Sequence, residues 1–250
     1  MKMTPIEHQH IENKKKSRST IAVSRKEAKY LVSLKDRLYL LSCLDKLLTP
    51  DAYGGYNGYS VRSLYFDSIL NTDYIEKVTK ADERKRIRLR IYTTKDTTVK
   101  FEIKRKYFGR QLKETIKITK EDAIEIINGN YKVLLKYNTD ISEYAYNLMT
   151  TNNYRPVSLV EYDRRAYTHK NFNTRITLDN NLRYADFDYD LFSDNVNFKQ
   201  ALDKDKTILE VKYDRFLFAQ IQDILSNCDF LGKPPSKYEA SRQLLKQYYY

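Results

Sequence analysis

The sequence predicts a mixed α+β fold in which an antiparallel β-sheet curves into a barrel with a charged interior, packed outside by amphipathic helices. Three observations support this prediction. Several segments alternate between apolar and charged residues, and the charged positions gather like charges in rows. In addition, about six segments show the apolar stripe of an amphipathic helix.

The alternation is clearest in residues 84–91, which read Arg84, Lys85, Arg86, Ile87, Arg88, Leu89, Arg90 and Ile91. The same two-residue period recurs in residues 100–104, 113–118, 175–179 and 209–213. In a β-strand, this period places successive side chains on opposite faces. Each of these strands is therefore expected to have one apolar face and one charged face, and the charged faces are mainly basic.

Two interpretations of the charged faces are open. In an ordinary antiparallel sheet they would face water, and the apolar faces would cover the core. In the barrel interpretation they line a central cavity, and the apolar faces pack outward against the helices. We favour the barrel because the helices need an apolar partner surface. The arginines at alternate positions would also repel one another at roughly 7 Å spacing unless a polyanion lies between them.

The helices follow from caps and apolar periodicity. Ser33 and Asp36 resemble a capping box, and the leucines that follow are expected to share one buried face: Leu34, Leu38, Leu41, Leu44 and Leu48. Thr119 is expected to cap a second helix that ends near Gly129, with Ile124 and Ile127 facing inward. Further helices are expected over residues 71–77, 142–149, 215–225 and 239–248.

Length and composition indicate one large domain. Of the 250 residues, we expect 1–20 to form a flexible polar tail and 21–250 to form the folded domain. No apolar run has the length of a membrane span, and the first residues do not resemble a signal peptide. The two cysteines, Cys43 and Cys228, lie in apolar helical patterns and are expected to be buried free thiols. Together these features predict a cytoplasmic protein.

The formal net charge of +12 implies an anionic partner. Acidic residues recur among the basic ones at Glu27, Glu102 and Glu210, and hard oxygen ligands of this kind suit Mg²⁺ or Mn²⁺ bridging phosphate oxygens. Arginine would hold phosphate by bidentate hydrogen bonds and lysine as a point charge. The sequence has no P-loop, no protein-kinase signature and no zincin histidine spacing.

Eight short blocks, taken together and in order, resemble the vacuolar transporter chaperone (VTC) catalytic type of the triphosphate tunnel metalloenzymes, which are part of the CYTH-like superfamily. The blocks are residues 25–30, 61–68, 86–92, 101–106, 161–167, 175–179, 209–213 and 235–238. Arg25 stands where the wider superfamily has its first glutamate, which favours the VTC branch. The resemblance spans about residues 22 to 245.

This resemblance implies an eight-stranded antiparallel tunnel, a closed barrel that binds a triphosphate inside. The residues that it assigns to phosphate binding are Lys29, Arg88, Arg90, Lys104, Lys113, Tyr162, Arg164, Arg175, Lys212, Ser236 and Lys237. The catalytic set that we expect is Arg88, Arg90, Lys104 and Glu210. Glu210 is expected to hold Mn²⁺ or Mg²⁺, with Glu102 and Glu27 as helpers.

The resemblance further implies metal-dependent phosphoryl transfer, with synthesis of inorganic polyphosphate from ATP as the leading hypothesis. The expected partners are therefore ATP or another triphosphate and polyphosphate itself. Two alternatives stay open: a triphosphatase or polyphosphatase of the same superfamily, and a non-catalytic module that binds polyphosphate or RNA. The 23 tyrosines could stack on bases, but without tryptophan in the chain we expect most of them in the core, and we do not expect nucleic acid as a partner.

Overall fold

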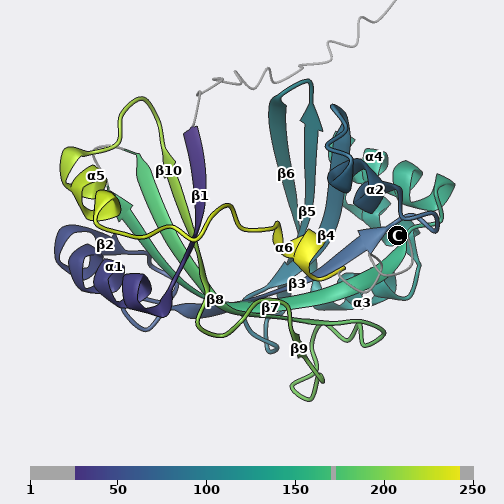
Figure 1. The fold of residues 1–250 in the computed structure, drawn as a ribbon. Helices are drawn as coiled ribbons and strands as arrows, with labels where there is room; N and C mark the ends of the chain where they lie inside the picture. The colour runs from purple at the N-terminus through teal and green to yellow at the C-terminus, as the bar shows by residue number, and fades with distance from the viewer. Residues whose placement is uncertain (1–25, 170–172, 243–250) are drawn as a thin grey trace, which may run out of the picture.

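Eight antiparallel strands form one strongly curved sheet in the computed structural model, which describes residues 26–169 and 173–242 (Figure 1). The strands are β1 (Lys26–Val32), β3 (Tyr59–Asp67), β4 (Arg84–Ile91), β5 (Thr98–Tyr107), β6 (Arg110–Thr119), β7 (Arg155–His169), β8 (Thr174–Ala185) and β10 (Thr207–Tyr213). Two short strands, β2 (Thr49–Pro50) and β9 (Lys199–Gln200), pair with β7 and β8. The predicted tail over residues 1–20 lies outside the described residues.

The sheet is not closed by hydrogen bonds, which corrects the expectation of a closed barrel. Its order is β1-β10-β8-β7-β3-β4-β5-β6, so β1 and β6 are the two edges, and no ladder joins them in the described part of the chain. The outer edge of β1 pairs instead with a later segment. The Leu31 N–H donates to the Gly232 carbonyl at 2.9 Å, and the Leu231 N–H donates to the Leu31 carbonyl at 2.8 Å. The eight strands and their antiparallel order agree with the prediction.

After this contact the chain crosses to the short helix α6 (Lys237–Ala240), which lies against the concave face of the sheet (Figure 1). Tyr238 anchors it there. This side chain is almost fully buried, its ring centroid is 5.0 Å from that of Tyr65, and its hydroxyl donates to Asp67 at 2.5 Å. The C-terminal segment therefore fills part of the space that a closed barrel would enclose.

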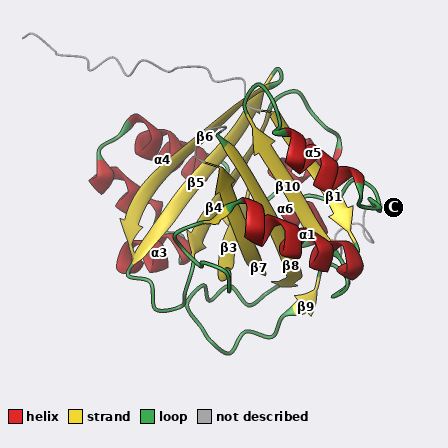
Figure 2. Ribbon diagram, turned by 90° about the vertical axis from the view of Figure 1, so that its left-hand side faces the viewer, coloured by secondary structure: helices red, strands yellow, loops and turns green. Residues whose placement is uncertain are grey.

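Helices cover the convex face on both sides of the curve (Figure 2). On one side, α1 (Leu34–Leu47) and α5 (Ala219–Ser226) pack on β1, β10 and β8 through a core that includes Leu40, Leu44, Ile176, Val211 and Ile221. On the other side, α3 (Lys120–Ile127), the 3₁₀ helix η1 (Tyr131–Tyr137) and α4 (Asp140–Thr151) pack on β4, β5 and β6. That core includes Ile87, Leu89, Phe101, Ile103 and Ile116. The apolar faces of the alternating strands thus point outward to the helices, as predicted.

The helix faces differ in part from the prediction. Ser33 does cap α1, and its side chain accepts from the Asp36 N–H, but Leu34 and Leu38 are 46% and 59% exposed. Leu40, Leu41, Leu44 and Leu48 form the buried stripe instead. Thr119 caps α3 as expected, whereas Ile124 is exposed and Ala123 and Ile126 face the core. The spacing of leucines alone could not fix which side of each helix meets the sheet, because several rotations place leucines inward.

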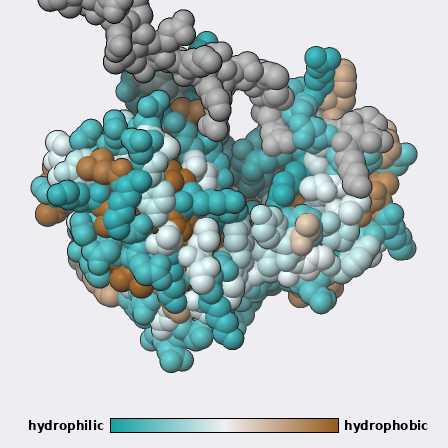
Figure 3. All heavy atoms as spheres, turned by 180° about the vertical axis from the view of Figure 1, so that it is seen from behind, coloured by the Kyte–Doolittle hydropathy of each residue, from teal (hydrophilic) through white to brown (hydrophobic). Residues whose placement is uncertain are grey.

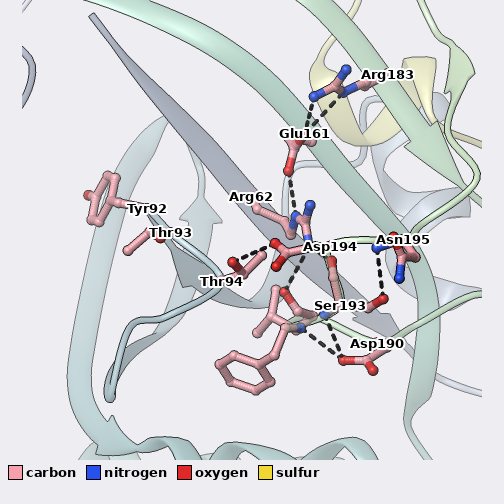
Figure 4. Close-up of polar contacts among 12 residues, drawn as sticks. Arg62, Tyr92, Thr93, Thr94, Glu161, Arg183, Asp190, Ser193, Asp194 and Asn195 are labelled. Atoms are coloured by element: carbon pink, nitrogen blue, oxygen red, sulfur yellow. Dashed lines mark hydrogen bonds and ion pairs between the residues drawn. The ribbon is translucent and has the colours of Figure 1, made fainter.

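A buried ion cluster ties the middle of the sheet to a covering loop on its convex side (Figure 4). Arg62 on β3 donates to Glu161 on β7 at 2.5 Å, and Arg183 on β8 donates to the same carboxylate at 3.0 Å. Arg62 also donates to the carbonyls of Leu191 and Ser193. These contacts hold the loop after β8 against the sheet, away from the concave face.

A buried carboxylate in α2 (Thr72–Val78) makes the stability of the fold depend on pH. Asp73 is fully buried; it accepts from the Tyr154 hydroxyl at 2.8 Å and lies 3.2 Å from the Lys85 ammonium. Burial, together with the negative charge of Asp67, raises the pKa of Asp73 to about 7 despite these contacts. The folded protein therefore binds a proton that the unfolded chain releases near its ordinary pKa of about 3.9.

We expect the free energy of unfolding to fall as pH rises from about 4 to about 7, because the proton held by folded Asp73 is lost over this window. Asp73→Asn should flatten this fall by about 1 kcal/mol per pH unit. Urea unfolding at several pH values measures the slope, and Asp82→Asn at an exposed loop position is the control. An unchanged slope in the Asp73 variant would assign the pH dependence to other groups.

Candidate anion-binding site on the concave face

Strand register places the charged residues on the concave face. Residues opposite each other in a ladder share a face, and the pairs include Arg88 with Glu102, Lys104 with Lys113, and Lys29 with Glu210. Since the apolar neighbours of these residues form the outer cores, the charged side chains must point inward. Figure 3 shows a recess lined by hydrophilic residues between the two halves of the molecule.

The two halves of the curved sheet face each other across this recess. Lys212 on β10 lies close enough to Lys104 on β5 for its positive charge to disfavour the charged form of Lys104. Arg86 on β4 has the same effect on Lys29 on β1. β10 and β1 lie at one end of the sheet order, whereas β4 and β5 lie near the other. Basic side chains from both ends therefore converge on one enclosed region.

Among these cations, Arg86 and Lys104 have no acidic partner in the part of the chain that the structure describes. With Tyr65 and Arg88 they line a cavity of about 30 Å³, which has room for at least one water molecule. Burial, reinforced by the positive charges of Arg88, Arg86 and Arg90, lowers the pKa of Lys104 to about 6. The lowered pKa of Lys104 thus reflects a positive potential, set by the neighbouring arginines, that the protein neutralises only in part.

Glu102 neutralises another part of the charge. It is 1% exposed, and its two oxygens contact Arg88 at 2.7 Å, Lys113 at 2.5 Å and Arg90 at 3.8 Å. Arg90 also donates to the Ser63 hydroxyl at 3.2 Å. Burial alone would raise the pKa of Glu102, but Arg88 and Arg90 outweigh it and hold the pKa well below the usual range. Glu102 therefore fixes the directions of three predicted phosphate-binding side chains.

Glu210 forms a second ion cluster on the opposite wall. It contacts Lys212, and Lys29 lies 3.7 Å from one oxygen of Glu210 and 2.7 Å from Glu27. Burial would raise the pKa of Glu210, but Lys29 and Lys212 lower it further than burial raises it. Among the residues that the structure describes, no three His, Cys, Asp or Glu side chains are grouped as a metal cage. One or two carboxylates are a donor set that suits Mg²⁺ or Mn²⁺ shared with a phosphate.

Asp179 joins the C-terminal segment to the sheet. It is 0% exposed, receives two hydrogen bonds from Arg164 at 2.6 and 2.7 Å, and lies 2.6 Å from the Lys237 ammonium. Burial would raise the pKa of Asp179, but Arg164 and Lys237 hold it at about 2. The Lys237 ammonium also lies 4.6 Å from the ring centroid of Tyr162. This cluster positions Lys237 over the concave face.

Asp179→Asn should destabilise the protein by about 2 kcal/mol, because the amide removes the charge that Arg164 and Lys237 share. It should also loosen α6 from the sheet. Chemical unfolding measures the first effect, and amide hydrogen exchange of residues 237–242 measures the second. Asp205→Asn, on an exposed loop, is the control. Native stability with faster exchange in α6 would show that Asp179 anchors the segment without supporting the fold.

The structure brings most of the predicted site residues to one face but not all into the same role. Arg175 lies at the end of the face, where it donates to Asp51 at 2.8 Å. Ser236 is the N-cap of α6 and accepts from the Glu239 N–H. Arg90 donates to the Tyr162 hydroxyl at 3.5 Å, which places that tyrosine beside the Glu102 cluster.

Three residues of the site were not predicted as such: Arg86, Tyr65 and Asp179. Arg86 has the same strand period as Arg88, so its place on the charged face could have been inferred. No pattern in the sequence marks Tyr65 as a site residue. In the structure, its hydroxyl accepts a hydrogen bond from Arg88 at 3.1 Å. Burial would raise the pKa of Tyr65, but Arg88, Arg90 and Arg86 lower it, which reflects the positive potential of the cavity.

Other features of the described chain do not compete with this site. A cavity of about 640 Å³ lies on the outside, between α3 and η1, and is lined by residues of mixed charge such as Glu121, Asp122, Lys132 and Lys136. It is separated from the concave face by β5 and β6. Of the helices in residues 26–169 and 173–242, none is long and apolar enough to cross a membrane.

Comparisons with known proteins agree with this architecture. The family model of the VTC domain matches residues 24–246. No curated protein sequence matches the chain. Among solved structures, an adenylyl cyclase candidate from Hippeastrum, described as having a dominant triphosphatase activity, is 12% identical with a TM-score of 0.56; the match covers 87% of this chain and 94% of that one. An adenylate cyclase candidate from Bacillus halodurans is 13% identical with a TM-score of 0.48, covering 85% and 96%.

Proposed function

The chain belongs to the VTC domain family, and from this premise we propose that it is a metal-dependent phosphotransferase that makes inorganic polyphosphate from ATP. The observation that carries the proposal is the excess positive charge in the recess. Arg86 and Lys104 have no acidic partner in the described chain, and others, such as Arg88 and Lys212, are held in direction by the buried carboxylates of Glu102 and Glu210. A linear polyanion would supply the missing negative charge.

The predicted residues would act by position and charge. Arg88 and Arg90 would donate to phosphate oxygens from β4. Lys104, on β5, would take up a proton as the anion binds and then contact it as a positive charge. Lys29 and Lys212 would do the same from the opposite wall. Phosphoryl transfer depends mainly on alignment and on neutralising the oxygens of the transferred group, and these side chains supply both.

We propose Glu210 as the main ligand of Mn²⁺ or Mg²⁺. Glu27 would help, because both carboxylates contact Lys29. When bound, such an ion withdraws charge from phosphate oxygens and aligns them. Glu102 remains a proposed helper, although its contacts with Arg88, Arg90 and Lys113 favour a role in orienting these cations. Lys29 and Lys212 would then be released from Glu210 and turn to phosphate.

The test is to incubate the pure protein with ATP and Mn²⁺ and to separate the products on a gel. A ladder of polyphosphate chains together with ADP is the expected result. ATP consumption with only short phosphate products would instead support a triphosphatase, in which water takes the place of the chain end at the same residues. The cytoplasm is the compartment that we propose for this activity, since ATP is its substrate.

A further inference from the structure

An aromatic cluster lies at the end of the concave face where β3 begins and β4 ends. The rings of Tyr53 and Tyr92 stack, with centroids 5.3 Å apart and an 18° angle between planes. Tyr59 lies 6.0 Å from Tyr53 and 5.7 Å from Tyr92. Tyr53 as a whole residue nevertheless remains 66% exposed, so part of its ring is open to a ligand. An exposed ring with a stacked ring beneath it is a surface on which another flat ring can stack.

This cluster continues directly from the basic recess. Tyr92 follows Arg90 by two residues and so shares its face, and Tyr59 is the ladder partner of Arg164. The Lys100 ammonium donates to the Tyr92 hydroxyl at 3.0 Å and lies 5.5 Å from the centre of the Tyr53 ring. Along β4, the row from Arg86 to Tyr92 spans roughly 20 Å at about 3.3 Å per residue. An extended chain of three phosphates followed by a nucleoside fits a row of this kind.

The loop that carries Tyr53 is tightly built. Asp51 is buried, accepts from the Tyr53 N–H at 3.2 Å and from the Tyr59 hydroxyl at 2.9 Å, and pairs with Arg175. A Cβ at Gly58, whose φ is +77°, would lie 2.5 Å from the carbonyl oxygen of Arg164, so the loop contacts β7 more closely than any side chain permits. The position of Tyr53 is therefore fixed by the same residues that hold Arg175 at the end of the recess.

We propose that the exposed ring of Tyr53, supported by Tyr92, binds the nucleobase of a nucleoside triphosphate whose phosphates lie in the basic recess. This proposal rests on the proposed function, because it requires the phosphates to bind there. It makes the site selective for a nucleotide over a bare polyphosphate of the same length. Any base can stack on a tyrosine, so the platform selects for a base without selecting which one.

The experiment compares ATP with inorganic tripolyphosphate, both measured by titration calorimetry with the full chain. Tyr53→Ala should weaken ATP binding about tenfold, which is the usual size of one base-stacking contact, and leave tripolyphosphate binding unchanged. Tyr53→Phe keeps the ring and should bind ATP as the native chain does. Tyr56→Ala is the matched control, since Tyr56 is 58% exposed in the same loop and no described aromatic ring stacks on it. Thermal unfolding confirms that each variant is folded.

Three outcomes would overturn the proposal. An Ala variant that binds ATP as tightly as the native chain would show that the base does not use Tyr53. Equal losses for ATP and tripolyphosphate would show that Tyr53 acts only on the phosphates or on the loop. A native chain that binds tripolyphosphate and ATP equally well would show that no base contact exists. If the native chain binds neither ligand, the proposed function fails first, and that result is distinct from the other three.

Discussion

Replacing Arg86 and Lys104 together by methionine should weaken tripolyphosphate binding roughly a thousandfold, because each removes a charged hydrogen-bond donor worth about 2 kcal/mol. These side chains line the small cavity with Tyr65 and Arg88 and have no acidic partner in the described chain. Both side chains can thus bind an anion without first breaking an ion pair, and Lys104 takes up a proton as the anion binds. Arg88, Lys212 and Arg164, by contrast, must leave Glu102, Glu210 and Asp179 to do the same.

The same double variant should be more stable than the native protein in the absence of ligand. Burial and neighbouring positive charge lower the pKa of both groups, which means that the folded protein disfavours their charged forms. Methionine has a similar length and carries no charge. A gain in stability of about 1 kcal/mol alongside a loss of binding is a combination expected of functional residues rather than structural ones.

Calorimetric titration with tripolyphosphate measures the binding, and urea unfolding measures the stability. A double variant with Lys35→Met and Lys46→Met makes the same change in net charge on the outside of α1, where both lysines are exposed. It should bind nearly as the native protein does. Native affinity in the Arg86 and Lys104 variant would show that the anion is held elsewhere on this basic protein.

Glu210→Gln should reduce metal-dependent turnover of ATP about a thousandfold while leaving metal-free tripolyphosphate binding intact or tighter. Glutamine keeps the shape of the side chain but gives up the anionic oxygen that a divalent ion prefers. It also frees Lys29 and Lys212, both of which contact Glu210. Turnover should therefore fall while binding of tripolyphosphate does not.

The measurement is the rate of ADP formation with Mn²⁺, together with calorimetry of tripolyphosphate without metal. Glu27→Gln is the comparison, and its smaller effect is expected because Glu27 is more exposed and contacts Lys29 rather than the recess centre. Full turnover in the Glu210 variant would remove Glu210 from the metal site. A native protein that binds tripolyphosphate but never turns over ATP would instead be a non-catalytic module.

The strands and their charged faces could be predicted from the sequence because the two-residue period is a local property. Arg88 and Arg90 needed only their neighbours Ile87, Leu89 and Ile91 to be assigned to one face. The resemblance to the VTC type then added the order of the blocks and the number of strands. It could not show that the edge of β1 pairs with residues 231–232 rather than with β6, since that choice depends on contacts between distant parts of the chain.

The missed features share this origin. Lys237 reaches Asp179 only because the C-terminal segment crosses the concave face, and Tyr53 reaches Tyr92 only because a loop with close glycine contacts folds over the end of β3. Helix rotation was also ambiguous in the sequence. The sequence alone does not show which of Leu38 and Leu40 is buried. Packing against β10 and β8 decides that it is Leu40.

A crystal structure of the protein with tripolyphosphate tests the central claim most directly. We predict one chain of phosphates along the concave face, with oxygens in hydrogen-bond contact with Arg86, Arg88 and Lys104 on one wall and with Lys212 on the other. Phosphate bound instead to exposed lysines on the outer helices, with the recess still filled by the ion pairs of Glu102 and Glu210, would contradict it.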